Sequence, residues 1–328
     1  MRYIILAAVS LVLVMSCEDS EKKRTLLDSS GKLNDVSVVI DNDIWDGPVG
    51  EAIRDVLAAP IYGLPQDEPI FNINQIPPSA FTGFIKKNRT LLKIEAGKEP
   101  AINFENNVYA QPQKLIIVSG KTKADIIKLV SDNSSRIIET FKGVELLYKQ
   151  QLIKKSLYNT KEIQENLGLD INFPTAYRVS KTLAKKEDKF YWLKKDTRTG
   201  YTNVLLYELP LKAIKKDSNL IGQIIKIRDS IGKKYIAGPI DGSYMITEDA
   251  YTPFHGETIL DNKPTLETKG MWEVENAVMA GPYINYAIED KINNRWIVAE
   301  GFAYAPSVAK RDYIFELEAI IKSIKINE

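Results

Sequence analysis

The sequence predicts an α+β protein with largely antiparallel sheets and flanking helices. Short β-branched and aromatic runs recur along the chain, separated by turn residues. Apolar stripes with a helical period stand between these runs. In the second half, strand-like runs follow one another through short turns, which favours antiparallel pairing.

The N-terminus, residues 1–16, has the pattern of a lipoprotein signal peptide. Arg2 precedes an almost entirely apolar run over residues 3–15, and a core of roughly 7–15 residues is typical of signal peptides. The run is shorter than the about 20 residues that span a bilayer. A small residue and Cys17 follow, so this stretch resembles the lipobox of bacterial lipoproteins. An ordinary secretory peptide that happens to contain a cysteine is the alternative.

Cys17 is predicted to carry the lipid. It is the only cysteine of the chain, so no intrachain disulfide can form. Several acyl chains on one residue anchor stably, at ~0.8 kcal/mol per buried CH₂. We therefore expect a lipid-anchored protein of the cell envelope. Its expected place is the outer membrane, on the periplasmic face or at the cell surface.

Residues 17–30 are predicted to form a flexible tether, because they are charged and short of core-forming side chains. The acidic pair Glu18 and Asp19 resembles the surface-export signal of Bacteroidetes lipoproteins. A plain solvated linker is the alternative.

The charge balance excludes one class of partner. Cleavage after residue 16 removes Arg2 from the 44 basic residues, which leaves 43 against 43 acidic ones. Such a chain offers no basic excess for nucleic acid, so we expect none as a partner. No later stretch approaches the ~18 apolar residues of a membrane helix, and the body is expected to be soluble.

The remainder is expected to form two α+β halves, residues 31–155 and 156–328, which can co-fold as one unit. A chain of this length usually makes one large domain or two ordinary ones. The elements expected before residue 120 are strands at 36–40, 70–76, 90–95, 101–104 and 114–119 and helices at 49–59 and 79–87.

A capping box is predicted at Thr122 and Asp125, where a threonine precedes an acidic residue by three positions. It begins a long helical region that reaches about Lys154. We expect an interruption near residues 133–135, where an asparagine and two serines follow one another.

The second half contains more strands in series. Turn residues 196–200 separate two of them and predict a hairpin. The expected elements are a helix at 160–167, strands at 177–180, 190–194 and 203–209, a helix at 219–231, strands at 243–247, 271–275, 283–289 and 295–304, and a last helix over 313–324. This order resembles that of PsbP-like folds, and no function is carried over from it.

The stretch 119–122, Ser-Gly-Lys-Thr, superficially resembles a nucleotide-binding loop between a strand and a helix. That chemistry needs an earlier glycine, so that backbone N–H groups can surround the phosphates. Leu115 occupies the position of that glycine. We therefore expect only a strand-to-helix turn.

An acidic loop follows the first predicted strand and is the candidate recognition site, with Asp41, Asp43, Trp45 and Asp46 as its residues. It fails as an EF-hand calcium loop, because the position that requires glycine is Asp46 and the one that requires glutamate is Ala52. Capping of the following helix by the carboxylates is the alternative to recognition through Trp45.

No catalytic, cofactor-binding or metal-binding residues are predicted. His255 is the only histidine, and we expect it in an exposed loop without a catalytic partner. Glu273 and Glu275 share one face of a strand, where a solvated sheet face is the simpler interpretation of paired carboxylates. The aromatic stripe at 296–304 is expected to pack in the core, with a carbohydrate-stacking surface as the alternative.

Several stretches resemble the uncharacterised Bacteroidetes lipoproteins grouped as domain of unknown function 4837 (DUF4837). They are Ser30–Asn34, Leu64–Pro69 with Phe71, Met271–Val274, Asn294–Phe302, Lys310–Tyr313 and Glu316–Glu318. The likeness extends over about residues 30–326. It implies an envelope lipoprotein whose halves co-fold, and it supplies no catalytic residues.

Two functions remain open on the sequence alone. The first is a non-enzymatic binding or interaction module, attached to the membrane through its N-terminal lipid, with an envelope protein or a glycan as its partner. The second is a hydrolase that acts on glycan or peptidoglycan. Convergent carboxylates in a deep cleft would favour the enzyme, and a broad apolar patch would favour the binding module.

Overall fold

The structure, a computed structural model, describes residues 25–180 and 189–327. Cys17 and the predicted signal peptide lie outside these residues. The elements of the first half are β1 (Asp35–Val39), α2 (Asn42–Trp45), α3 (Pro48–Leu57), β2 (Asn72–Ile76), η1 (Pro78–Ala80), η2 (Ile85–Lys87), β3 (Thr90–Ala96), β4 (Ala101–Asn106), β5 (Lys114–Gly120), α4 (Lys123–Asp132) and α5 (Ser134–Lys154).

The second half is richer in strands. Its elements are α6 (Lys161–Leu167), β6 (Leu169–Asp170), β7 (Arg178–Val179), β8 (Phe190–Thr197), β9 (Gly200–Pro210), η4 (Leu211–Ala213), α7 (Leu220–Tyr235), β10 (Met245–Thr247), β11 (Phe254–Leu260), β12 (Lys263–Val274), β13 (Ala277–Asp290), β14 (Arg295–Tyr304), α8 (Arg311–Ile321) and β15 (Lys325–Ile326). The expected α+β class is confirmed.

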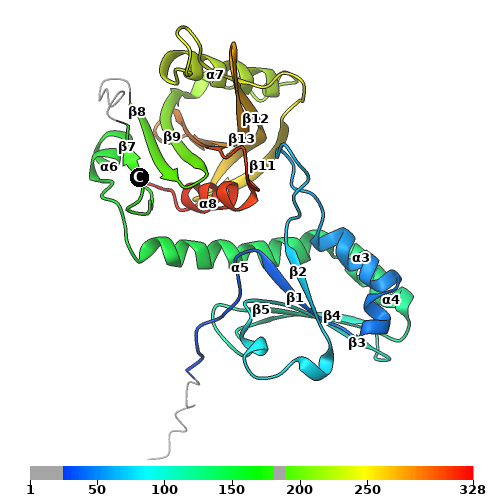
Figure 1. Ribbon diagram of the computed structural model, residues 1–328. Helices are drawn as coiled ribbons and strands as arrows, with labels where there is room; N and C mark the ends of the chain where they lie inside the picture. Colours follow the sequence, from blue (N-terminus) through cyan, green and yellow to red (C-terminus); the bar gives the residue numbers. More distant parts are fainter. Residues whose placement is uncertain (1–24, 181–188, 328) are drawn as a thin grey trace, which may run out of the picture.

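The first half contains a five-stranded sheet in the order β2-β1-β3-β5-β4. Only β4 runs antiparallel to its neighbour, and the other three pairings are parallel. This sheet therefore departs from the largely antiparallel expectation. The reason is the crossover through α3, which returns the chain to the end of the sheet where β1 began. Helices α3, α4 and α5 cover one face of the sheet (Figure 1).

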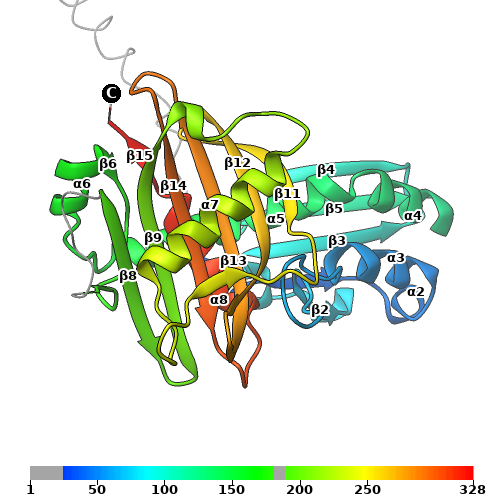
Figure 2. The same ribbon diagram turned by 90° about the horizontal axis from the view of Figure 1, so that it is seen from above.

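The second half contains an eight-stranded sheet in which all the pairings are antiparallel, as expected. Helix α7 crosses one face, and α8 lies against the other (Figure 2). Both faces of β14 are therefore buried, with Trp296, Val298 and Phe302 under α7 and Ile297 and Ala299 toward α8. The aromatic stripe belongs to the core, so the carbohydrate-stacking alternative is wrong.

Helix α5 joins the two halves. It packs on the first sheet through Ile137 and Phe141, and it contacts α8 of the second half (Figure 1). The predicted break at residues 133–135 is confirmed, since α4 ends at Asp132 and α5 begins at Ser134.

Three local predictions fail for identifiable reasons. The expected helix at 79–87 is two short 3₁₀ turns, because prolines precede it and Gly83 adopts a positive φ within it. Strand β11 was not expected, and it places His255 in a sheet rather than a loop. The strand expected at 271–275 begins at Lys263, because the first eight residues of β12 are mostly polar or charged and hide the strand pattern.

The end of the predicted tether is part of the fold. The Ser29 N–H donates to the carbonyl of Gln111 at 2.9 Å, and the Ser30 N–H donates to the carbonyl of Lys87 at 2.9 Å. The chain therefore meets the folded body at about Leu27. Within the described part of the chain, no helix is both long and apolar enough to cross a bilayer.

Candidate functional site

A cleft of about 600 Å³ opens between the two halves of the molecule. The first half contributes the segment after α3, the two residues before β2 and one face of α5. The second half contributes β11, β12 and α8. Aliphatic side chains from both halves line the walls, among them Ile61, Ile70, Ile138 and Ile314. A concave, mainly apolar site with a few polar groups is the usual form of a binding pocket.

Two aromatic rings stand at the rim of this cleft, one from each half. Tyr62 and Phe254 stack with their centroids 5.5 Å apart and their planes 7° from parallel. Tyr62 is 71% exposed and Phe254 is 43% exposed. Each ring covers one face of the other, so the pair presents its edges and outer faces to a ligand.

Gly63 sets the position of Tyr62. Its φ is +84°, and a Cβ built there would lie 3.0 Å from the backbone nitrogen of Gly270 in β12. The segment after α3 can therefore approach the strand closely only because residue 63 lacks a side chain. This close approach brings Tyr62 from the first half onto Phe254 of the second.

The floor of the cleft is charged, and its charges are paired. The carboxylate of Glu318 in α8 forms two ion pairs, one with Lys142 Nζ at 2.8 Å and one with Lys322 Nζ at 2.7 Å. Burial by itself would raise the pKa of Glu318, but the two ammonium groups outweigh it and hold the pKa below its ordinary value. Glu318 is thus an ionised carboxylate that joins α5 to α8.

Glu267 of β12 has a similar environment. Its carboxylate lies 3.1 Å from Lys269 Nζ and accepts a hydrogen bond from the hydroxyl of Tyr286. Burial would raise its pKa, yet Lys269 and this hydrogen bond bring it below the ordinary value. A general acid for glycoside hydrolysis needs the opposite shift. The two carboxylates on the floor are therefore arranged as structural ion-pair partners.

The first half also supplies the cap of α8. The carboxylate of Glu68 accepts hydrogen bonds from the N–H groups of Lys310 and Arg311, at 2.6 and 2.8 Å. These are N–H groups that a helix start leaves without a partner in the helix itself. On α5, Lys149 pairs with Glu316 at 2.6 Å. These polar contacts hold the first half of the molecule against the second.

A second groove, of about 580 Å³, runs between α3 and the α4–α5 corner. It shares Ala59 and Ile138 with the cleft, so the two depressions adjoin. Glu51 and Asp55 give this groove an acidic side. Together the two depressions can accept an elongated ligand.

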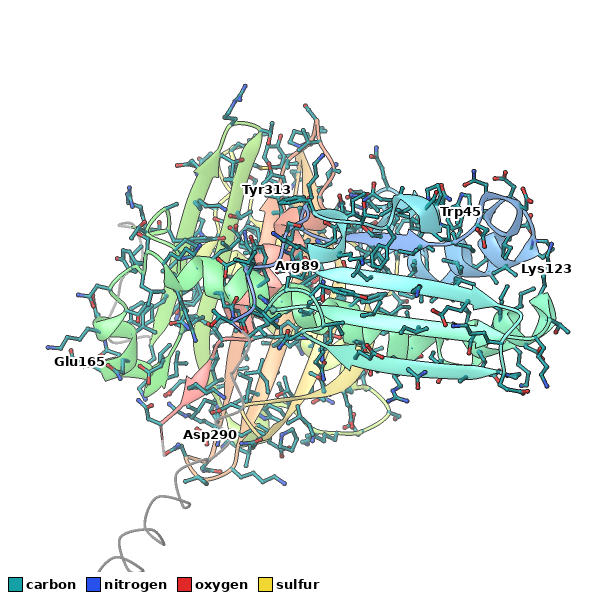
Figure 3. The ribbon with its side chains drawn as sticks, turned by 90° about the horizontal axis from the view of Figure 1, so that it is seen from below. Trp45, Arg89, Lys123, Glu165, Asp290 and Tyr313 are labelled. Carbon is teal, nitrogen blue, oxygen red and sulfur yellow. The ribbon has the colours of Figure 1, made fainter. Side chains whose placement is uncertain are left out.

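The predicted recognition loop lies elsewhere. Asp41, Asp43 and Asp46 are exposed around the short helix α2. The Trp45 ring is half-buried beneath the Arg54 guanidinium, 4.7 Å from its centroid. Figure 3 shows Trp45 at the outer end of the first half, on the side of Lys123 and far from Tyr313 of α8. None of these four residues lines the cleft.

The capping interpretation of the same carboxylates is wrong. Gly47 occupies the N-cap position of α3, and Asp41, the N-cap of α2, makes no side-chain capping bond. Pro48 at the start of α3 removes one N–H group that would need such a partner. In the described ranges, no three His, Cys, Asp or Glu side chains are grouped to hold a metal ion.

The Ser-Gly-Lys-Thr stretch forms the expected strand-to-helix turn. Thr122 Oγ1 accepts from the Asp125 N–H at 3.2 Å, and Asp125 accepts from the Thr122 N–H at 2.8 Å, so the capping box is confirmed. Gly120 has a packing role, because a Cβ there would lie 2.8 Å from Cγ1 of Ile126.

The remaining candidates do not form a site with one another. His255 is partly buried on β11, opposite Thr268 of β12. Trp272 is buried in the core while Glu273 and Glu275 are partly exposed, as expected for a sheet with one solvated face. Partial burial and then the neighbouring carboxylates of Glu248 and Asp249 raise the pKa of Glu273.

The residues of the cleft were not among those predicted from the sequence. Tyr62 lies in a segment that its prolines and glycine mark only as a break after a helix. Phe254 lies in a strand whose apolar pattern is too weak to detect. Lys142 and Glu318 lie in predicted helices. Charged residues in a helix are mostly exposed in proteins, so the sequence gives no reason to expect these two to be buried. No signal in the sequence alone brings these four together.

Two family models match this chain in adjacent stretches. Residues 156–323 match the model described as a domain of unknown function, DUF4837. Residues 29–154 match a second model described as a domain of unknown function, DUF8532. The resemblance at 271–274 and 294–302 thus falls in the first match, whereas that at 30–34 falls in the second. No curated protein matches the chain.

Proposed function

Since the chain belongs to the family described as domain of unknown function DUF4837, a description that names no activity, we propose a function from the geometry of the cleft. The protein is a lipid-anchored, non-enzymatic component of the cell envelope. It binds a polypeptide segment of a partner protein between its two halves. The observation that carries this proposal is the open cleft with aliphatic walls and an aromatic rim.

The chemistry of the cleft favours a binding role over hydrolysis. A hydrolase of glycans needs one carboxyl group that stays protonated and another that is free to act as base or nucleophile. Glu267 and Glu318 are both ion-paired, with lowered pKa values. Lysine ammonium groups lie at ion-pair distance from both carboxylates, and a tyrosine hydroxyl also donates to Glu267.

A polypeptide suits the walls better than a sugar does. Sugar rings bind proteins through open faces of aromatic side chains, and here such faces are confined to the outer sides of the Tyr62–Phe254 pair at the rim. Aliphatic walls such as those at Ile61 and Ile138 instead accommodate apolar side chains. The adjoining acidic groove favours a segment that also carries basic residues.

Envelope attachment rests on the N-terminal sequence. A Cys17→Ser variant is expected to lose lipidation and to accumulate as an unprocessed precursor or a soluble product, because its side chain offers no thiol for the lipid. Metabolic labelling with a radioactive fatty acid measures this directly. Ser20→Ala, which leaves the residues up to Cys17 intact, should label like the parent chain. Label retained by the Cys17→Ser variant would falsify lipid attachment at this residue.

The binding role is tested by site-specific cross-linking in the native envelope. A photoreactive benzoylphenylalanine in place of Tyr62 should give a cross-linked adduct of discrete mass. The same residue in place of exposed Ile292, outside the cleft, should give none. Adding Ile138→Lys to the Tyr62 variant should abolish the adduct, because a charge on the apolar wall opposes ligand entry.

The chemical nature of the adduct decides the partner. Digestion of the added mass by a protease that spares the folded chain supports a polypeptide ligand. Removal by a muramidase or another glycosidase would identify a glycan and overturn the polypeptide assignment. Equal adducts from positions 62 and 292, or persistence with Ile138→Lys, would show that the cleft is not the binding site.

A further inference from the structure

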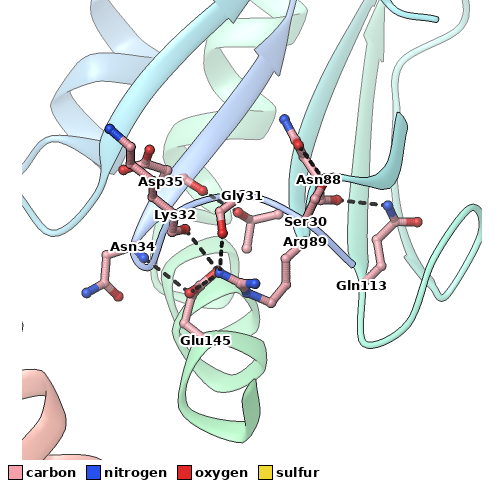
Figure 4. A network of polar contacts seen from close by, with 10 residues as sticks. Ser30, Gly31, Lys32, Asn34, Asp35, Asn88, Arg89, Gln113 and Glu145 are labelled. Carbon is pink, nitrogen blue, oxygen red and sulfur yellow. Dashed lines mark hydrogen bonds and ion pairs between the residues drawn. The ribbon is translucent and has the colours of Figure 1, made fainter. Parts of the chain in front are cut away.

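The start of the folded chain is fixed against one side of the first sheet. The Gln111 N–H donates to the carbonyl of Leu27 at 2.9 Å, and the Ser30 N–H donates to the carbonyl of Lys87 at 2.9 Å. The Ser30 hydroxyl donates to the Asn88 side chain at 3.1 Å (Figure 4). The start of the described chain therefore lies beside Gln111 at Leu27 and beside the loop that ends at Lys87 three residues later, at Ser30.

That loop carries an exposed aromatic ring with one ammonium group over it, and a second ammonium group lies nearby in the chain, over two other rings. Phe84 is 71% exposed at the tip, next to Gly83, whose φ is +48°. Lys87 Nζ lies 5.6 Å from the Phe84 ring, and Lys86 Nζ lies 5.7 Å from the ring of Phe81. Leu27, at the start of the fold, is 61% exposed. Leu27, Phe84, Lys86 and Lys87 are together called the Phe84 surface.

The two lysines of this surface are half-buried, with their ammonium groups over aromatic rings, and their charges are not neutralised by an acidic side chain of the described residues. Over residues 25–180 and 189–327, neither Lys86 nor Lys87 lies within ion-pair distance of a carboxylate. Asp28 is the acidic residue of the adjoining segment, and its backbone bridges to Gln111. An exposed apolar side chain among basic ones is the composition that binds the interface of an anionic bilayer.

The Phe84 surface also lies on the outer face of the molecule. The loop covers Val39, Leu91 and Leu115 on the face of the five-stranded sheet opposite α3, α4 and α5. The second half lies beyond α5, on the other side (Figure 1). A bilayer can therefore contact the Phe84 surface without meeting the second half.

We propose that the Phe84 surface rests on the bilayer that holds the lipid of Cys17, with Phe84 at the interface and Lys86 and Lys87 against anionic headgroups. The inference rests on the proposed lipid anchor. Leu27 is the tenth residue after Cys17, so the two lie at most about 35 Å apart along a fully extended chain. The anchor thus keeps this surface close to the membrane, and the contact fixes which side of the body faces it.

The test uses the full lipidated chain in vesicles of phosphatidylcholine and phosphatidylglycerol. Because Cys17 is the sole cysteine and is blocked by lipid, Thr82→Cys supplies one free thiol for a fluorescent probe beside an intact Phe84. Nitroxide groups on the lipids should quench this probe. They should leave a probe at Val278→Cys, on an exposed hairpin of the second half, unquenched.

Two further variants separate the apolar and the electrostatic contributions. In the Thr82→Cys background, Phe84→Ser should remove most of the quenching. Lys86→Glu with Lys87→Glu should do the same, and added salt should weaken the quenching of the parent. Equal quenching at positions 82 and 278, or a probe at 82 shielded from water without lipid quenching, would overturn the bilayer contact. The second of these results would indicate a protein partner instead.

The failure of the anchor is a distinct outcome. A parent chain that does not float with vesicles refutes lipidation at Cys17, and with it the basis of this proposal. A chain that floats while the probe at 82 behaves like the probe at 278 leaves the anchor intact and refutes the Phe84 surface.

Discussion

Glu300→Ala is expected to lower the free energy of unfolding by about 3–5 kcal/mol, which is the cost of leaving a buried cation without its counter-ion. Arg228 of α7 and Glu300 of β14 form a bidentate pair in which both N···O distances are 2.8 Å. Their side chains are 1% and 2% exposed. Asn285 Nδ2 donates to the same carboxylate at 2.8 Å.

Tyr283 and Thr247, which contact Arg228, cannot replace the lost charge, and the carboxylate of Asp229 is linked to Arg228 through the Thr247 hydroxyl, which donates to it at 2.8 Å. The Tyr283 ring lies 3.5 Å from the Arg228 guanidinium, and burial raises the pKa of Tyr283 to about 12, so the ring remains neutral. Thr247 accepts one further hydrogen bond from Arg228. Urea unfolding at 25 °C would measure the change. An effect below about 1 kcal/mol would mean that water reaches the site.

A matched double variant distinguishes loss of the pair from loss of packing. Arg228→Met with Glu300→Met removes both charges and keeps apolar volume, and buried pairs replaced in this way are often neutral in stability. We expect the double variant to recover most of the loss. Glu165→Ala, at an exposed ion pair on α6, is the surface control and should leave the midpoint unchanged.

Glu145→Ala is expected to destabilise the first half by a comparable 3–5 kcal/mol, for the same physical reason. Glu145 of α5 pairs with Arg89 at 2.8 and 3.0 Å, and the two side chains are 0% and 1% exposed (Figure 4). The carboxylate also accepts the Asn34 N–H at 3.1 Å. The Tyr148 ring lies 3.7 Å from the guanidinium.

The Arg89–Glu145 pair differs from the Arg228–Glu300 pair in the groups that lose a hydrogen-bond partner when both charges are removed. Arg89 Nη2 donates to the carbonyls of Lys32 and Gly31, at 3.0 and 3.4 Å. A double Arg89→Met, Glu145→Met variant would therefore leave backbone groups without partners. It should recover less stability than the double variant at Arg228.

Hydrogen exchange supplies an independent readout for Glu145→Ala. Amides of the segment from Gly31 to Asn34 should exchange faster, whereas those of β14 should be unaffected in the native state. Unchanged exchange in that segment would contradict the assigned role. If the two halves co-fold, the Glu145 and Glu300 variants will lower one common transition. Separate transitions would each respond to one variant.

The parts of the fold that the sequence predicts are those governed by local rules. The capping box at Thr122, the break before Ser134 and the hairpin at 196–200 depend on neighbouring residues, and all three are present. The parallel order of the first sheet depends on how β1, β2 and β3 meet, which no local pattern specifies.

The site escaped prediction because it is made of long-range contacts. Tyr62 and Phe254 come from opposite halves of the sequence, and they meet through the backbone approach at Gly63. Composition pointed instead to the acidic loop around Trp45, which lies at the outer end of the molecule. The burial of charged residues such as Arg89 and Glu300 could not be predicted either, since residues of these types are mostly exposed in proteins.

The contact between Glu68 and the start of α8 links the evolution of the two halves. Glu68 lies in the stretch that matches DUF8532, whereas Lys310 and Arg311, which donate to it, lie in the stretch that matches DUF4837. A recombination event that exchanged one stretch alone would leave a carboxylate facing a foreign surface and a helix start without its acceptor. A chimera that joins one stretch to a foreign partner is therefore expected to be destabilised at residue 68, and this contact limits how independently the two stretches can diverge.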